Sequence, residues 1–332
     1  MLTTDTCGSR LLVDVHVRPG QSNTLRQDAL AGLTRDPKQL PPKHFYDARG
    51  SELFDAICRT PEYYPTRTEQ ALLEQVSERV MRSVRPTHLV ELGSGMARKT
   101  HVLLTAAAAQ GQQPRYVPFD VSETALRHSA ETLLSSYAWL SVHGVVGDYD
   151  HHLHLLPRGD RRLIAFLGGT IGNFEHHEAI RFLQRVAKTM GPGDALLLGT
   201  DLVKQKITLD RAYNDAAGVT AAFNLNVLRV MNRELGANFD ESRFRHVAFY
   251  DEDTRRIEMH LESLAPQRVR LQALELDVEF KLGERMRTEI SRKFSEEAVA
   301  ELFGAAGLEL THWFTPSDQA FALSLAKLPS RN

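Results

Sequence analysis

The chain has 332 residues, of which 42% are hydrophobic and 25% are charged, and its formal net charge is −2. This composition fits a globular protein of one large or two ordinary domains, and the lack of a basic excess argues against nucleic acid or an anionic membrane as partners. No apolar run reaches the roughly 18 residues of a membrane-spanning helix, no signal-peptide pattern is visible, and Cys7 and Cys58 are too few for a disulfide scaffold, so we expect a cytoplasmic protein.

The chain changes character at residue 68. Residues 1–67 are polar and rich in turn-forming residues, although "GSELFDAICRT" has helical apolar spacing. An amphipathic helix, "TEQALLEQVSERV", follows, and short apolar runs then alternate with helical segments. The predicted strands are 88–92, 115–119, 142–146, 162–167 and 194–199, and the predicted helices are 97–110, 122–135 and 176–190. This alternation predicts βαβ units, and therefore a parallel sheet with helices on both faces.

The alternation stops near residue 201. Residues 202–293 contain a long helical stretch and then candidate strands at 244–250 and 255–263, followed by the period-2 pattern of "RVRLQALELDVEF", so we expect an inserted, largely antiparallel region. A helix at 295–306 and strands at 308–314 and 319–326 then close the sheet with a hairpin. We therefore predict an α/β fold in two parts. They are a Rossmann-like core of residues 68–201 and 294–332, and a second, mixed α+β domain of residues 1–67 and 202–293.

The stretch "LVELGSGMARKTHVLL" (89–104) reads as a strand, a glycine turn and the start of a helix, an arrangement that binds nucleotides. Gly93 and Gly95 are present, but Arg98 stands where the dinucleotide fingerprint G-x-G-x-x-G needs its third glycine, which disfavours a dehydrogenase. Glu91 instead gives the acid-x-Gly-x-Gly form that is typical of class I S-adenosylmethionine (SAM) methyltransferases. A purely structural turn is the alternative.

Acidic residues end the next two predicted strands. Asp120 in "YVPFDVS" could accept both hydroxyls of a ribose, and Asp148 in "VVGDYD" could accept the amine of adenine. Lys99, early in the first helix, is a candidate for the carboxylate of the cofactor. The alternatives are a helix cap or surface group for each acid and a solvated side chain for the lysine. Together these signals favour SAM as the cofactor, bound by Gly93, Lys99, Asp120 and Asp148.

Methyl transfer from a sulfonium needs positioning and exclusion of water, but no metal and no nucleophile from the protein. "DYDHHLHLL" lies in a predicted loop with no cysteine nearby, so we expect no metal site. The fourth strand is followed by "FLGGTIGNF", whose glycines allow a ligand to approach the backbone. Asn173 in this stretch offers a donor and an acceptor that could aim the lone pair of an amine, and a turn or helix N-cap is the alternative.

Further segments follow one another along the chain: "LPPKHFYDARGSELFDAI", "PEYYPTRTE", "VELGSG", "PFDVS", "FLGGTIGN", "LLLGTDLVK", "RAYNDAAGVTAAFNLNVL", "RIEMHL" and "TEISRKFS". In this order they resemble the L-histidine Nα-methyltransferases of ergothioneine biosynthesis, over residues 25–327. The resemblance implies a class I SAM-dependent methyltransferase core with a second, substrate-binding domain, and a monomer. The implied reaction is three successive methyl transfers from SAM to the α-amino nitrogen of L-histidine, which give hercynine.

The resemblance also implies the residues that bind the substrate, which are Tyr63, Asn173, Tyr213, Met259, Glu289 and Ser291. Glu289 and Ser291 would hold the imidazole, whereas Tyr46 and Asn173 would act in catalysis beside the amine. From the residues alone, Glu289 and Ser291 are two apart on a predicted strand, so both face one way and can serve a ring with one donor and one acceptor. Tyrosine faces, with that of Phe54, tolerate a growing ammonium through cation–π attraction, although ordinary half-buried tyrosines are the alternative.

Two other functions remain open at this point. One is SAM-dependent N-methylation of another small amino acid or amine, against which Glu289 and Ser291 argue because an apolar pair would suit such a substrate better. The other is a nucleotide-binding protein without catalytic activity, against which the set of polar residues argues.

Overall fold

The computed structural model describes residues 10–17, 24–95, 98–149 and 151–330. The chain forms two compact units, and each is described by itself. The first, called the core unit, comprises Met1–Pro19, Arg67–Leu202 and Phe294–Asn332. The second unit comprises Gly20–Thr66 and Val203–Lys293. Within the described ranges, no helix combines the length and apolar character needed to cross a lipid bilayer.

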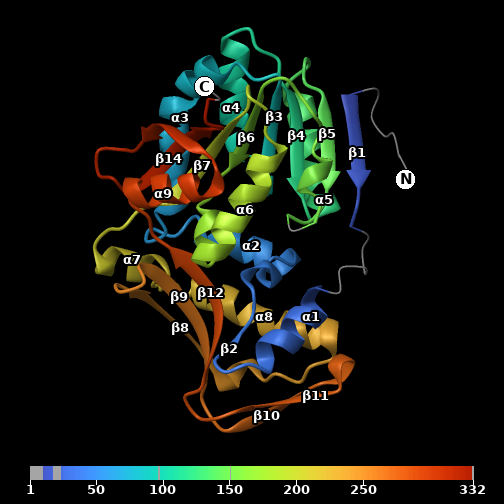
Figure 1. The fold of residues 1–332 in the computed structure, drawn as a ribbon. Coiled ribbons are helices and arrows are strands. Elements are labelled where there is room, and N and C mark those ends of the chain that lie inside the picture. The colour runs from blue at the N-terminus through green and yellow to red at the C-terminus, as the bar shows by residue number, and fades with distance from the viewer. Residues whose placement is uncertain (1–9, 18–23, 96–97, 150, 331–332) are drawn as a thin grey trace. The chain divides into compact units, whose positions relative to one another are not determined.

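Within the described residues, the core unit is built on an eight-stranded sheet with the order β1-β5-β4-β3-β6-β7-β14-β13 (Figure 1). The strands are β1 (Leu11–Val15), β3 (His88–Leu92), β4 (Arg115–Asp120), β5 (Val142–Val146), β6 (Arg162–Phe166), β7 (Ala195–Asp201), β13 (Glu309–Phe314) and β14 (Phe321–Lys327). From β1 to β7 in this order the neighbours are parallel, and β14 and β13 add an antiparallel hairpin. The predicted parallel strands and the closing hairpin are therefore confirmed.

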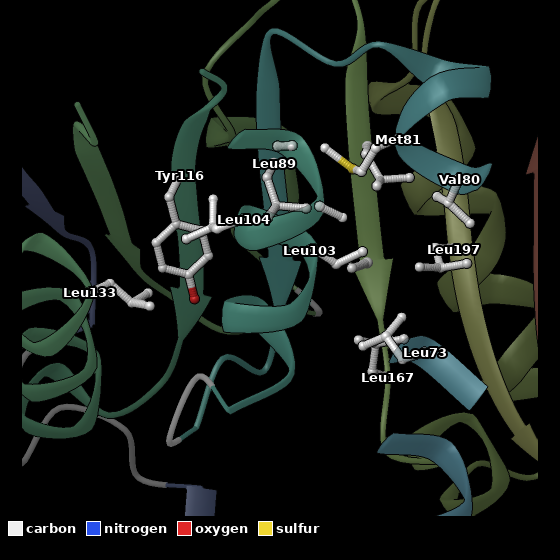
Figure 2. Close-up of a cluster of buried hydrophobic side chains, with 14 of the residues drawn as sticks. Leu73, Val80, Met81, Leu89, Leu103, Leu104, Tyr116, Leu133, Leu167 and Leu197 are labelled. Atoms are coloured by element: carbon white, nitrogen blue, oxygen red, sulfur yellow. The ribbon is translucent and has the colours of Figure 1, made fainter. Parts of the chain in front are cut away.

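Helices cover both faces of this sheet because adjacent strand residues point to opposite sides. Leu89 of β3 packs with α3 (Pro65–Val84), α4 (Arg98–Ala109) and α5 (Glu123–Ser136), as Figure 2 shows in part. Its neighbour Val90 belongs to the other cluster, with α6 (His176–Thr189) and α9 (Glu296–Ala306). Each fully buried side chain of this kind contributes about 1.5–3 kcal/mol of transfer free energy, so the two clusters hold the three layers together.

The amino-terminal strand corrects the sequence analysis, which assigned residues 1–67 to the second domain. Leu11–Val15 pairs in parallel with Val142–Val146, so β1 is an edge strand of the core sheet. Leu11 and Val13 are buried in the cluster on the α3 side. The run "LLVDV" is short and isolated among polar residues, and its partner lies far along the chain, so local periodicity did not reveal it.

The second unit contains a four-stranded sheet of order β2-β12-β9-β8 and a separate hairpin, β10-β11. The strands are β2 (Lys38–Gln39), β8 (Phe244–Asp251), β9 (Arg256–Ser263), β10 (Gln267–Leu271), β11 (Leu276–Phe280) and β12 (Arg285–Arg292). The helices are α1 (Thr24–Leu33), α2 (Ala48–Ile57), α7 (Lys206–Ala212) and α8 (Val219–Leu235). The pairs β8–β9, β9–β12 and β10–β11 are antiparallel, as predicted for this region, whereas the short β2 joins β12 in parallel.

The core of the second unit lies between α8 and the sheet. Phe223, Val227 and Met231 repeat at intervals of four residues along α8, which places them on one face, and they pack in one cluster with Met259 and Met286. The register of β12 against β9 shifts between Arg287 and Glu289, so the strand has a local irregularity directly before Glu289. Such bulges change the direction of side chains along a strand.

Candidate active site

The glycine turn after β3 leaves its backbone open on one side. Gly93 has φ 76° and Gly95 has φ 45°, in the left-handed region that glycine tolerates best. A Cβ at Gly93 would lie 2.5 Å from Oη of Tyr149, whereas a Cβ at Gly95 would meet no atom of the described residues within 4 Å. A side chain at Gly93 is therefore disfavoured by both φ and packing, while Gly95 faces space that the described residues leave open to a ligand.

Asp120, at the end of β4, ties the turn to the neighbouring strand. Its Oδ2 accepts a hydrogen bond from the backbone N–H of Gly95 (3.2 Å), and its Oδ1 accepts one from Ser122 N–H (2.9 Å). Ser122 is the N-cap of α5, so the alternative in which Asp120 caps the helix is wrong. A carboxylate has about four lone-pair sites, so Asp120 retains acceptor capacity for the hydroxyls of a ribose.

Asp148 follows β5 and begins a tight turn. Its backbone N–H donates to Nδ1 of His152 (3.0 Å), and its carbonyl oxygen accepts from the N–H of the same histidine (2.8 Å). Tyr149, the next residue, stacks on Phe119 with the ring centroids 5.5 Å apart. Through these two hydrogen bonds, His152 stabilises the turn that follows β5. Across the described residues, no group of three or more His, Cys, Asp or Glu side chains is arranged to hold a metal ion.

Lys99 is held by a buried carboxylate that sequence reasoning missed. Its Nζ forms an ion pair with Glu69 of α3, whose side chain is 1% exposed. Oε1 of Glu69 also accepts a hydrogen bond from Gly168 N–H (2.7 Å), and a Cβ at Gly199 would lie 2.3 Å from the same oxygen. Lys99 is therefore not a freely solvated lysine. Glu69 joins α3, the first turn of α4 and the loop after β6.

Asn173 ends the 3₁₀ turn Thr170–Asn173, which follows two glycines in the left-handed region. The N-cap of α6 is Glu175, whose backbone N–H donates to Oε2 of Glu178 (3.0 Å) in a capping box, so the alternative in which Asn173 caps this helix is wrong. The amide of Asn173 is half-buried and has no hydrogen-bond partner among the described residues. Its donor and acceptor are thus available to a ligand.

In the second unit, the three tyrosines that the sequence singled out belong to one row of aromatic rings. The centroid of Tyr46 lies 5.6 Å from that of Phe54, which lies 6.2 Å from Tyr63, which lies 6.1 Å from Tyr213. All three contacts are edge-to-face, an arrangement that favours aromatic pairs. The row joins the residue after the 3₁₀ turn Pro42–Phe45, helix α2, the loop before α3 and the end of α7.

Glu289 lies on β12 directly opposite Met259 of β9, which is 1% exposed. The carboxyl of Glu289 is half-buried and accepts no hydrogen bond from the described residues. Burial raises the pKa of Glu289 to about 7, and the charge of Lys293 opposes this rise. Glu289 and Met259, both named as substrate-binding residues in the sequence analysis, are thus neighbours across two strands. Met259 is apolar, and Glu289 is an acceptor with unused capacity.

Ser291, Tyr213 and Lys293 form a triangle of hydrogen bonds. Oη of Tyr213 donates to Oγ of Ser291 (2.9 Å), and Nζ of Lys293 donates to both of these oxygens, at 2.8 Å to Ser291 and 3.1 Å to Tyr213. Lys293 is 4% exposed, and sequence reasoning missed it. A signal was present, because Glu289, Ser291 and Lys293 continue the same alternation along one segment.

A second polar network fixes the backbone at Tyr213. Nε2 of His246 donates to the carbonyl oxygen of Tyr213 (2.9 Å), while its Nδ1 accepts from Nδ2 of Asn224 (2.9 Å). Oδ1 of Asn224 in turn accepts from Oγ1 of Thr288 (2.7 Å). This pattern requires a neutral imidazole, and burial lowers the pKa of His246 in agreement with it. The position of Tyr213 is therefore set by three different elements of the unit.

The candidate residues thus form two groups, one in each unit. The group of the core unit lies at the carboxyl ends of parallel strands or in the helix and turn that follow them, where open α/β sheets bind ligands; it consists of Gly93, Lys99, Asp120, Asp148 and Asn173. The group of the second unit lies on the aromatic row or on strands β9 and β12; it consists of Tyr46, Tyr63, Tyr213, Met259, Glu289 and Ser291.

Comparison with known proteins adds independent information. Residues 25–328 match the family described as "Histidine-specific methyltransferase, SAM-dependent". Over 305 residues the chain is 50% identical to the histidine N-alpha-methyltransferase of Mycolicibacterium smegmatis, which covers 92% of this chain and 95% of that protein. It is 33% identical over 300 residues to ergothioneine biosynthesis protein 1 of Neurospora crassa (88% of this chain, 33% of that protein). It is 28% identical over 311 residues to 4-dimethylallyltryptophan N-methyltransferase of Claviceps purpurea (86% and 90%).

Proposed function

The chain belongs to the SAM-dependent histidine-specific methyltransferases, and we propose that it transfers three methyl groups in succession from SAM to the α-amino nitrogen of L-histidine. The product would be hercynine, in agreement with the likeness to a protein of ergothioneine biosynthesis. The observation that carries the substrate assignment is the pairing of Glu289, a carboxyl with unused acceptor capacity, with the hydroxyl of Ser291 on the same strand. An imidazole offers the matching donor and acceptor on one ring.

The core unit would hold the methyl donor. Asp120 would accept the ribose hydroxyls, Asp148 the adenine amine, Lys99 would face the carboxylate, and the open side of the glycine turn would allow close approach to its backbone. When bound, SAM supplies an electrophilic methyl group on a sulfonium. The protein then needs no nucleophile or metal of its own, only a means to aim the amine and to exclude water.

The amine presents the chemical problem of the reaction. An amino group is mostly protonated near neutral pH, and only its neutral form has the lone pair that attacks the methyl group. We propose that the amide of Asn173 orients this nitrogen, that the phenol oxygen of Tyr46 accepts a hydrogen bond from its N–H, and that the proton itself passes to solvent water. Tyr46 is 49% exposed, which gives the proton a path outward.

Successive methylation removes the N–H donors of the amine, so the substrate must be held at its other ends. Glu289, Ser291 and Met259 would hold the imidazole, and Tyr63 and Tyr213 would contact the carboxylate and amine. The aromatic row offers ring faces to the growing ammonium, an attraction worth about 0.5–2 kcal/mol. Reaction ends at the third transfer because a quaternary nitrogen has no lone pair.

The experiment is direct. Purified protein is incubated with SAM and L-histidine, and mass spectrometry follows the appearance of mono-, di- and trimethylated histidine. We expect all three species in sequence, with the trimethylated form accumulating. Binding of SAM without any methylated histidine would overturn the proposal.

A second candidate is N-methylation of another amino acid, since the likeness to the Claviceps purpurea protein shows that related sequences include a tryptophan-derivative N-methyltransferase. Competition between L-histidine, L-tryptophan and L-phenylalanine decides between them. We expect kcat/KM to favour histidine, because indole and phenyl rings offer Ser291 no acceptor. We also propose a cytoplasmic monomer. Light scattering of the purified protein tests the oligomeric state, and fractionation of the source cells tests the location.

A further inference from the structure

We propose that Lys293 is a positioning residue that fixes Ser291 as a hydrogen-bond donor, so that Glu289 and Ser291 together select the neutral imidazole in one tautomer. This inference rests on the proposed function and deepens it. Lys293 contacts Ser291 and Tyr213, which are predicted to bind the substrate, and the sequence analysis did not assign Lys293 to the site.

The direction of the hydrogen bonds follows from the chemistry of the groups. A lysine ammonium has three donors and no acceptor, so both of its contacts to oxygen must be donations by Lys293. Tyr213 Oη accepts one of them and directs its own hydrogen to Ser291 Oγ. The serine oxygen thus accepts two hydrogen bonds, which occupy both of its lone pairs. Only its own hydrogen remains, and among the described residues that hydrogen meets no acceptor.

The side chains lie on one face of the strand segment. Residues 289, 291 and 293 alternate along it, and alternate side chains of an extended chain point the same way. Glu289 therefore presents an acceptor next to the position where Ser291 presents a donor. Lys293 lies behind Ser291 at 4% exposure and over the ring of Tyr213, with Nζ 4.9 Å from the centroid.

This arrangement lets Glu289 and Ser291 distinguish the protonation states of the substrate imidazole. A neutral imidazole has one N–H and one bare nitrogen, which suit Glu289 and Ser291 respectively. An imidazolium has two N–H groups and would set a donor against the serine donor. An indole has one N–H and no bare nitrogen. Leaving one buried donor unpaired costs about 1–3 kcal/mol, or roughly fivefold to 150-fold in binding, so the pair discriminates against both.

Lys293 also acts on Glu289 through its charge. Among the described residues, the other titratable groups near this carboxyl are the phenols of Tyr46 and Tyr63, with Tyr213 and the thiol of Cys58 beside them. Its partner across the sheet, Met259, is uncharged. Because the lysine charge holds the pKa of Glu289 down against burial, its loss would protonate the carboxyl at a higher pH. The acidic limb of kcat/KM for histidine would then move upward in pH.

The test compares Lys293→Met, Ser291→Ala and the double variant. We expect Lys293→Met to raise the KM for histidine about tenfold or more, with the KM for SAM unchanged and kcat affected much less. At a pH above the acidic limb of every variant, where Glu289 stays ionised, the lysine acts through the serine alone, so the double variant should be close to the worse of the two single variants. Lys204→Met is the matched control, because Lys204 donates to Oη of Tyr64 (2.7 Å) and lies over that ring in the same unit; it should leave the KM for histidine unchanged.

Three outcomes are decisive. An unchanged histidine KM in Lys293→Met, or fully additive effects in the double variant, would overturn the inference while leaving the proposed function intact. Absence of histidine methylation by the wild-type protein would instead defeat the proposed function. If Lys293→Met does not fold, Lys293→Gln carries the test, since it keeps a donor for Ser291 but loses the charge. It should shift the acidic limb upward and retain more histidine affinity than Ser291→Ala, and failure of either expectation also counts against the inference.

Discussion

Glu91 in the core unit and Glu289 in the second unit are both carboxyls whose pKa burial raises to about 7. Their surroundings differ. Glu91 accepts hydrogen bonds from Oγ1 of Thr100 in α4 and from Oη of Tyr116 in β4 (2.7 Å), which fasten β3 to the helix after the glycine turn and to the neighbouring strand. Glu289 accepts none from the described residues. A shifted pKa therefore does not by itself mark a functional group, and the unused hydrogen-bonding capacity distinguishes the two.

The contrast extends to the lysine of each unit. In the core unit Lys99 pairs with Glu69, which also binds a backbone N–H, so that charge is compensated within the fold. In the second unit Lys293 is directed at two hydroxyls beside the aromatic row. In the core unit the buried carboxyls of Glu69 and Glu91 thus have partners within the protein. The second unit instead leaves a side-chain carboxyl without a protein partner.

Removal of Glu289 should have the largest effect. Glu289→Ala takes away the acceptor for the imidazole N–H, and a hydrogen bond to a charged group is worth about 1.5–3 kcal/mol, so we expect the histidine KM to rise roughly tenfold to hundredfold. The KM for SAM should stay within a factor of about two. Steady-state kinetics with each substrate varied in turn provide the measurement. An equal loss of affinity for both substrates would place Glu289 outside the histidine pocket.

The cost of keeping Glu289 ionised should appear in stability. Its folded pKa of about 7 lies above the ordinary value of 4.5, so its contribution to stability is complete below pH 4.5 and is lost as the pH rises through 7. Glu289→Gln should therefore be more stable than the wild type at pH 8, by up to about 3 kcal/mol, and the difference should vanish at low pH. Urea unfolding at several pH values measures it. The exposed Glu301 on α9 provides the control, since Glu301→Gln should show no such trend.

Removal of Glu91, a buried carboxyl of the core unit, should instead lower the free energy of unfolding. Glu91→Ala leaves the hydroxyls of Thr100 and Tyr116 without their acceptor, and we expect a loss of about 1–3 kcal/mol in unfolding free energy. The measurement belongs at about pH 4, below the ordinary value of 4.5, where the carboxyl is mostly protonated in both the folded and the unfolded state and its raised pKa contributes little to the difference. A variant as stable as the wild type would contradict this prediction and would mean that these hydroxyls, 3.4 Å apart in the wild type, pair with each other instead.

The two units also differ in how far the sequence could reveal them. In the core unit, periodicity located the parallel strands, and topology then placed Asp120 and Asp148 at neighbouring strand ends without any knowledge of tertiary contacts. Strand β1 was not predicted because its partner, β5, lies far along the chain. Glu69 was not predicted to be buried because it belongs to an amphipathic helix pattern, in which a charged residue normally faces solvent. Its partners, Lys99 and Gly168, are also distant from it in sequence.

In the second unit, the alternation of Glu289 and Ser291 on one strand was visible in the sequence, and the same alternation extended to Lys293. What the sequence could not show is the shift in register after Arg287, since a bulge depends on how two strands pair rather than on local composition. Nor could it show that Phe54 links the tyrosines, because that depends on where α2 lies against the loop carrying Tyr63.

The smallest expected effect concerns Lys99 of the core unit and its partner Glu69. Glu69→Gln keeps an oxygen for the N–H of Gly168 but removes the charge that holds Lys99, so Lys99 should lose its fixed position while the fold persists. We expect the KM for SAM to rise roughly threefold to tenfold, which matches the roughly 0.5–1.5 kcal/mol net contribution of a typical hydrogen bond, with the histidine KM unchanged. Glu78→Gln on the same helix is the control, because Glu78 and its partner Arg82 are exposed and 3.8 Å apart, and such surface pairs contribute about 0–1 kcal/mol. If Glu69→Gln instead raised the histidine KM alone, Lys99 would have to be reassigned from the methyl donor to the acceptor.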